Sequence, residues 1–173
     1  MPMPAYLTIE GKTQKDITAN ANTADSVGNT HQKNHIDEIL VQAFEHKVSI
    51  PRDTQSGQVT GPRVHHPFKI TKAFDNTSPQ LHRALVDGEK LKCLLELYRD
   101  AGEGDPQLYY RVFMEEAVIV DIVSRMPNCQ DTAQANFGHM EDVYISYTKI
   151  VWEHQITGTN SSDNWREPAA AVG

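Results

Sequence analysis

Histidine pairs are the first residues of this sequence that could do chemistry, because two histidines one helical turn apart can hold a zinc ion. His31 and His35 have this spacing, but Gln, Lys and Asn lie between them, so the glutamate of a metalloprotease motif is missing. The surrounding residues show no helical period. We interpret both as exposed loop histidines, with a zinc site as the weaker alternative. His65 and His66 begin a strand and point to opposite faces, so they do not easily share a metal.

Paired acidic residues are the next candidates, since two carboxylates can supply the acid and the base of a hydrolase. Glu115 and Glu116 are adjacent, and Asp121 follows. Adjacent side chains of a strand project to opposite faces, so a charged sheet rim explains them better. The sequence has no Gly-x-Ser-x-Gly elbow, and Gly57 and Gly61 do not form a phosphate-binding loop. We therefore expect no enzymatic activity, no metal and no cofactor.

The composition narrows the class of protein further. The chain has 173 residues and a formal net charge of -7, so it is expected to repel phosphate backbones and not to bind nucleic acid. It has no apolar run of about 20 residues, so we expect no membrane insertion. The first residues do not have the pattern of a secretory signal, which predicts synthesis and folding in the cytoplasm. Cys93 and Cys129 are then expected to be reduced thiols.

Most of the chain alternates between apolar and polar residues with the period of β-strands. Residues 6–10 predict a short strand, and residues 36–50 predict a long, half-buried one that ends before Pro51. The wetter face of the long strand carries Ala43, Glu45 and Lys47. Residues 12–35 are polar and predict an irregular segment. A further strand at 68–74 pairs with the long one, so residues 36–74 read as an extended hairpin.

One segment has the signals of a helix. Ser78 is suited to the N-cap, and Pro79 to the first helical position, where a missing N–H is tolerated. Leu81, Ala84 and Leu85 form a narrow apolar stripe, and Gly88 ends the segment. The sequence predicts one short helix here, long enough to cover an open end of a sheet structure.

The C-terminal half predicts strands at 91–99, 107–117, 118–125 and 143–156. The last of these is apolar on both faces, which normally means that both faces are covered. A neighbouring subunit is a natural cover, so Tyr144, Ile150 and Trp152 are predicted at a subunit interface. The fold class is therefore mainly β: an antiparallel barrel, or two packed sheets, with one short α-helix. We expect one domain at 1–157 and a polar, flexible tail at 158–173.

The connection "RDTQSGQVTGPR" is the least ordinary feature of the hairpin. Most hairpin loops have two to five residues, so one of this length is expected to be functional or disordered. Its groups can form hydrogen bonds and ion pairs with another chain. The predicted contact residues are Arg52, Asp53, Gln55, Ser56, Gly57, Gln58, Val59, Thr60, Gly61 and Arg63.

Several motifs in order resemble one family, the Hcp (haemolysin co-regulated protein) tube subunits of type VI secretion systems. The resemblance covers about residues 6–166 and is carried by "YLTIEGKTQ", "ADSVGN", "DEILVQAFEH", "QSGQVTGPRVHHPF", "VIVDIVSRMPNCQD" and "KIVWEHQITGTNSSDNWR". It implies a hexameric ring of β-barrel subunits, which stacks into a hollow tube inside a contractile sheath and carries a trimeric spike at its tip. It further implies that the extended loop reaches the adjacent ring and that small effector proteins bind in the lumen.

The resemblance also implies export from a Gram-negative cell, without a signal peptide, to the extracellular space or a target cell. On the residues alone, the wetter face with Ala43, Glu45 and Lys47 is a candidate for the lumen wall, and an outward solvated face is the alternative. Two other functions stay open. One is a free-standing β-sandwich binding module, and the other is a secreted effector enzyme, which the short tail makes less favourable.

Overall fold

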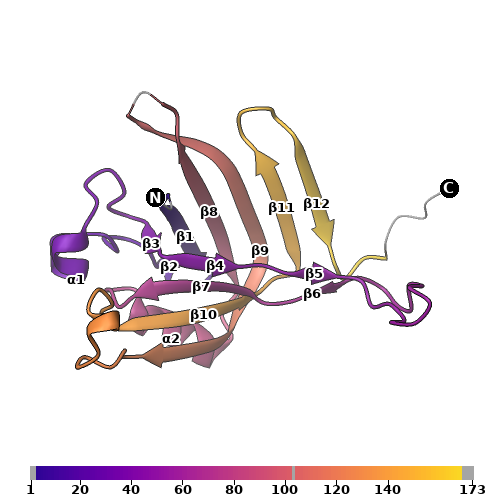
Figure 1. Cartoon of the computed structure of the whole chain (residues 1–173), viewed down its shortest axis with the longest axis horizontal. Helices are drawn as coiled ribbons and strands as arrows, with labels where there is room; N and C mark the ends of the chain where they lie inside the picture. Colours follow the sequence, from indigo (N-terminus) through magenta and orange to yellow (C-terminus); the bar gives the residue numbers. More distant parts are fainter. Residues whose placement is uncertain (1–2, 103, 169–173) are drawn as a thin grey trace.

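The computed structural model describes residues 3–102 and 104–168 and shows a mainly β protein built from two antiparallel sheets that share one strand (Figure 1). The predicted fold class is confirmed, although the sheets do not close into a complete barrel in the described part of the chain. We call the two sheets sheet A and sheet B. In the described residues, no helix is long and apolar enough to cross a membrane.

Sheet A contains most of the strands, and β9 lies near its centre. Its strands are β1 (Ala5–Gly11), β2 (Lys15–Asp16), β3 (Ile39–Val41), β8 (Leu91–Asp100), the first half of β9 (Pro106–Arg125), β11 (Lys149–His154) and β12 (Asn160–Asn164). β1 pairs with β8, β8 with β9, β9 with β11, and β11 with β12, while β2 and β3 share the other edge of β1.

Sheet B is smaller and lies across sheet A. Its order is β4 (Ala43–Glu45), β7 (Phe68–Ala73), β10 (Met140–Ser146) and the second half of β9. The core lies between the sheets and is formed by inward side chains such as Leu7, Leu95, Met114, Phe68 and Val143, all without exposed surface. A two-stranded ribbon, β5 (Val48–Ser49) with β6 (Val64–His65), continues beyond sheet B.

Strand β9 joins the two sheets because it bends in the middle. The sequence predicted two strands, 107–117 and 118–125, whereas the structure has one strand of 20 residues. The bend falls at the predicted junction, where Glu116 has a φ of 47° and the pairing with β8 shifts between Leu91 and Cys93. An extra residue on one strand of an antiparallel pair bends that strand in this way. β9 therefore leaves sheet A at this point and continues in sheet B.

The predicted long strand at 36–50 is wrong in its continuity, because the segment is divided into β3, β4 and β5. β3 pairs with β1 in sheet A, and β4 pairs with β7 in sheet B. The segment crosses between sheets near Gln42, whose N–H still donates to the carbonyl of Thr71 at 2.8 Å. Its alternating pattern is real, but it does not correspond to one continuous strand.

The predicted strand at 143–156 is also two strands, β10 in sheet B and β11 in sheet A. Tyr147 and Thr148 lie between them and change which positions point inward. Val143 and Ile145 are buried before the break, and Ile150 is buried after it. The apolar residues on both apparent faces therefore result from a change of sheet, and an external cover is not needed to explain them.

The predicted helix is confirmed as α2 (Ser78–Asp87), and it packs against β9. Its stop is also confirmed, since Gly88 adopts a left-handed conformation with φ 62°. The predicted N-cap is wrong by one position, because Thr77 occupies the cap. The Ser78 hydroxyl instead donates to Glu141 at 2.7 Å. Shorter helical turns, α1 (Ala24–Val27), η1 (Gly28–Thr30) and η2 (Thr132–Gln134), were not predicted.

The polar segment after residue 157 contains β12, which is antiparallel to β11. Its residues, Asn-Ser-Ser-Asp-Asn, have no apolar alternation, so the sequence contains no strand signal there. The remainder of the expected tail includes residues 169–173, which lie outside the described part of the chain.

Candidate assembly surfaces

The connection between β5 and β6 projects away from both sheets (Figure 1), and we call residues 50–63 the arm. Residues 51–60 are all exposed. Within the described residues, the hydrogen bonds of 52–60 stay inside the arm. Beyond its base, the arm is thus not stabilised by hydrogen bonds to the rest of the described chain.

The end of the arm is nevertheless an ordered turn. The amide of Asp53 donates to the Gln58 carbonyl, and the amide of Gly57 donates to the Asp53 carbonyl, both at 2.8 Å. The Asp53 carboxylate accepts hydrogen bonds from the Gln55 amide and the Ser56 hydroxyl, at 3.0 and 2.9 Å. These bonds hold the pKa of Asp53 below its ordinary value. Gly57 has φ 73°, a conformation that favours glycine.

The base of the arm is tied to the C-terminal strand by charges. Arg63 donates from Nε and Nη2 to the two carboxylate oxygens of Asp163 on β12, at 2.5 and 2.9 Å. The same Nη2 reaches the carbonyls of Asn164 and Glu167 at 2.9 and 2.8 Å. Hydrogen bonds from Arg63, followed by one from His65, hold the pKa of Asp163 below its ordinary value despite partial burial.

A chain of rings lies beneath this ion pair. His65 Nε2 lies 2.7 Å from Asp163 Oδ2, and His65 Nδ1 lies 2.6 Å from the Tyr147 hydroxyl. That hydroxyl lies 2.9 Å from His46 Nε2. Burial, and then the nearby Asp163 charge, raises the pKa of Tyr147. Burial, and then His65, lowers the pKa of His46. His46 precedes β5 and His65 is on β6, so both sides of the arm base are held.

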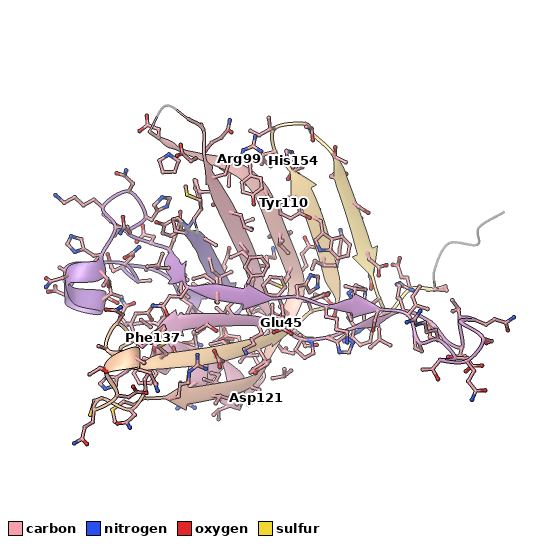
Figure 2. The ribbon with its side chains drawn as sticks, viewed as in Figure 1. Glu45, Arg99, Tyr110, Asp121, Phe137 and His154 are labelled. Carbon is pink, nitrogen blue, oxygen red and sulfur yellow. The ribbon has the colours of Figure 1, made fainter. Side chains whose placement is uncertain are left out.

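The outer face of sheet B carries a row of polar side chains across all four strands. The strand register places Glu45 beside Lys69, Lys69 beside Tyr144, and Tyr144 beside Asp121. Figure 2 shows Glu45 and Asp121 at opposite edges of this sheet. The Lys69 ammonium lies 5.9 Å from the centre of the Tyr144 ring. Acidic, basic and aromatic groups thus lie together on a partly solvated surface.

The three lumen candidates, Ala43, Glu45 and Lys47, are exposed on or next to this outer face. A shallow pocket of about 370 Å³ lies there, where sheet B meets the arm. Its lining residues are Glu45, Lys47, His66, Pro67, Lys69 and Tyr144. The structure therefore brings two of the candidates together with Lys69 and Tyr144.

The three predicted interface residues are not equivalent in the structure. Ile150 has no exposed surface and belongs to the core, so its place at a subunit interface is corrected. Tyr144 is half-buried on the outer face of sheet B. Trp152 is half-buried beside the rings of His46 and His65 at the arm base. The single-strand interpretation placed these three on one face because it missed the change of sheet.

Sheet B has free edges on both sides within the described residues. β4 pairs on one side only, with β7, and residues 118–125 of β9 pair on one side only, with β10. Val120 and Val123 on the β9 edge are 49% and 44% exposed. An apolar edge strand with unpaired backbone groups is suited to joining another chain.

The residues considered first for chemistry are not brought together. Glu115 faces Lys149 at 3.6 Å, whereas Asp121 lies on the outer face of sheet B. His35 stacks on Tyr6 with ring centres 3.7 Å apart and lies 2.9 Å from the Glu38 carboxylate. In residues 3–102 and 104–168 no group of three histidine, cysteine or acidic side chains has the arrangement of a metal site.

The arrangement also contains groups that the sequence did not single out. Asp163 and Tyr147 organise the arm base, but they are far from it in the chain, and the residues around them do not indicate this role. A separate pocket of about 570 Å³ collects basic side chains at the end of β1 and the start of β8. Its charged lining residues are Lys12, Lys15, Lys90, Lys92, Arg166, Glu10 and Glu116.

Comparisons with known proteins agree over almost the whole chain. The family model described as "Type VI secretion system effector, Hcp" matches residues 6–154. The "Major exported protein" of Pseudomonas aeruginosa is 52% identical over 171 residues, which cover 98% of this chain and 99% of that protein.

Solved structures lead to the same family. A crystal structure of an Hcp protein matches with a TM-score of 0.92 and 40% identity, over 96% of this chain and 99% of that one. The secreted protein Hcp3 from Pseudomonas aeruginosa matches with a TM-score of 0.80 and 44% identity, over 95% and 99%. The chain belongs to the Hcp family of type VI secretion proteins.

Proposed function

We propose that this protein is a structural subunit of the inner tube of a type VI secretion system, without catalytic activity of its own. Six copies form a ring, and rings stack into a hollow tube that carries small effector proteins. The observation that carries this proposal is the arm: an ordered turn on a protruding hairpin, with all of residues 51–60 exposed. Such a turn is preformed for contact with another chain, so docking costs little conformational entropy.

The free edges of sheet B support the formation of a ring. The β4 edge and the β9 edge belong to different sides of the same sheet, so a contact between them is head-to-tail. A head-to-tail contact closes into a ring when its rotation divides a full turn. We infer that the β9 edge of one copy lies against the β4 edge of the next.

A ring joined through these edges has the outer face of sheet B as a continuous wall. We infer that this wall faces the lumen, with Glu45 and Lys69 among the groups that meet cargo. Its polar, mixed charge is compatible with a water-filled channel that releases its contents. The proposed partners of the tube are a trimeric spike, a contractile sheath and small effectors, and the proposed destination is the extracellular space or a target cell.

Deletion of Ser56–Gly61 tests the role of the arm. These residues form the end and one side of the arm, and their hydrogen bonds stay within residues 51–60, so the subunit is expected to fold and to form rings. We expect rings of six by mass measurement, no tubes by negative-stain electron microscopy, and no secretion from a bacterium with a working type VI system. Arg83→Ala, on the exposed side of α2, is the control and should behave as wild type.

The outcomes separate the alternatives. Tubes and normal secretion from the deletion variant would reject the arm as the stacking element. Wild-type protein that stays a monomer at every concentration and salt would reject the tube subunit and favour a free-standing binding module.

A further inference from the structure

The arm is held in place by the C-terminal strand, although the two are about a hundred residues apart in the chain. Figure 1 shows β12 ending where β5 and β6 begin the arm. The contact is a two-point ion pair between Arg63 and Asp163, and both side chains are mostly shielded, with 16% and 25% exposed. Bidentate pairs of arginine and carboxylate fix orientation as well as distance.

A second contact of the Asp163 carboxylate, with His65, connects the ion pair to the other side of the arm base. A carboxylate only accepts hydrogen bonds, so His65 donates to Asp163 from Nε2. A neutral His65 then accepts from the Tyr147 hydroxyl at Nδ1, and the Tyr147 oxygen accepts from His46 Nε2. In this series of hydrogen bonds, each donor has an acceptor, and the donors all point along the series toward Asp163. The His65 side chain is only 2% exposed. The arm base is therefore a single connected network whose one carboxylate is Asp163.

The length of the arm makes this network important, because a small change of angle at the base displaces the end of the arm by a much larger distance. Beyond its base, the arm has no hydrogen bond to the rest of the described residues, so its direction is decided at the base. A hairpin that runs roughly eight residues from base to end is about 25 Å long. A tilt of about 10° at the base then moves the end by about 4 Å, which exceeds the tolerance of a hydrogen bond.

We propose that Asp163 is the positioning residue of the arm and that β12 belongs to the apparatus of ring stacking. Asp163 does not touch the next ring in this proposal; it directs Arg63 and His65, and through them the arm. The inference rests on the proposed function, since it assumes that the arm makes the stacking contact. The proposal also assigns a structural role to the polar C-terminal segment, which its composition does not indicate.

Asp163→Asn tests the proposal because it keeps the shape of the side chain and removes the charge. Amide hydrogen exchange at the arm base, where the His66 amide donates to the Lys47 carbonyl and the Trp165 amide donates to the Thr148 carbonyl, is expected to become about tenfold faster or more, since hydrogen bonds to a charged group are lost. Exchange in β1 and β8 and the mass of the ring are expected to stay unchanged, while tube formation falls. Asp105→Asn, in an exposed turn, is the matched control and should change neither exchange nor tubes.

A second variant covers the case in which Asp163→Asn does not fold. Arg63→Lys keeps the charge but loses the two-point fork, so it should loosen the arm in the same way. Unchanged exchange of the arm base, or an equal increase in β1 and β8, would overturn the proposal in either variant. If wild-type rings never stack, the proposed function fails, but faster exchange confined to the arm base in the variants would still support Asp163 as the anchor of the arm.

Discussion

At the scale of single residues, His46 shows how burial changes the pKa of a side chain. Its ring lies 4.9 Å from that of Phe68 and 6.1 Å from that of Trp152, and its pKa is lowered from an ordinary value of 6.5 by burial and by His65. The folded state therefore disfavours the protonated ring. In the unfolded chain the same ring is free to take up a proton.

The free energy of unfolding should therefore fall as the pH drops below 6.5. The unfolded chain binds more protons there, so stability rises with pH in that range and is lost as the pH falls through the folded pKa of His46. His46→Gln should make this decline shallower between pH 7 and pH 5, measured by denaturant unfolding at a fixed protein concentration. His82→Gln, on the exposed side of α2, should leave the slope as it is, and equal slopes in both variants would contradict the prediction.

At the scale of elements, a buried ion pair connects β7 and β10 to the start of α2. Lys72 and Glu141 have no exposed surface, and the Lys72 ammonium lies 2.6 Å from Glu141 and 3.0 Å from Asp75. The Ser78 hydroxyl in the first turn of α2 donates to the same Glu141 oxygen. The other Glu141 oxygen has no partner among the described residues. The helix therefore sits on a network of charges that water does not reach.

Removal of the buried ammonium should be costly. Lys72→Met leaves the Glu141 carboxylate buried without its counter-charge, so we expect a loss of about 3–5 kcal/mol of unfolding free energy. Urea denaturation measures it. Lys69→Met, on the outer face of the same strand, should cost far less, and the double change Lys72→Met with Glu141→Leu should recover much of the loss. A single variant as stable as wild type would show that the pair does not hold this end of the sheet.

At the scale of the whole molecule, the sheet edges and the arm point in different directions. The edges of sheet B lie on its two sides, whereas the arm continues beyond the ends of its strands (Figure 1). Contacts through these two surfaces would leave the subunit in two directions. The proposed ring and its stacking require this.

The ring contact is tested by charging the β9 edge. Val120→Lys with Val123→Lys places two ammonium groups on an apolar edge, and lysine is a common means of preventing edge pairing. We expect this protein to be a folded monomer by light scattering. Lys69→Glu is the control on the outer face, because Lys69 lies on β7, between β4 and β10 and away from both edges. It should keep the ring and change only the amount of effector that is retained. Rings formed by the double variant would remove the β9 edge from the interface.

Much of the fold could be predicted because it follows from local patterns. The period of two at 91–99 and 68–74 corresponds to β8 and β7, and the signals from Pro79 to Gly88 correspond to α2. The arm was identified by its length and polarity alone. These features depend on neighbours within a few residues, which a sequence displays directly.

The rest depended on partners distant in the chain. An alternation with a period of two predicts which side chains of a strand share a face, but it does not predict which sheet the strand joins. The breaks near Gln42 and Tyr147 therefore could not be predicted from the sequence. The polar strand β12 forms because β11 offers its edge, and its own residues have no pattern. Asp163 and Arg63 meet for the same reason.

The sequence by itself thus determined the β class, the helix α2, the protruding arm and the family, because each of them follows from local periodicity or from motifs in a fixed order. Only the tertiary structure decided that Ile150 belongs to the core and that, among residues 3–102 and 104–168, both edges of sheet B are free. It also decided that the C-terminal strand holds the arm. Long-range pairing sets these features, since the free energy of a contact depends on which surfaces the fold brings together.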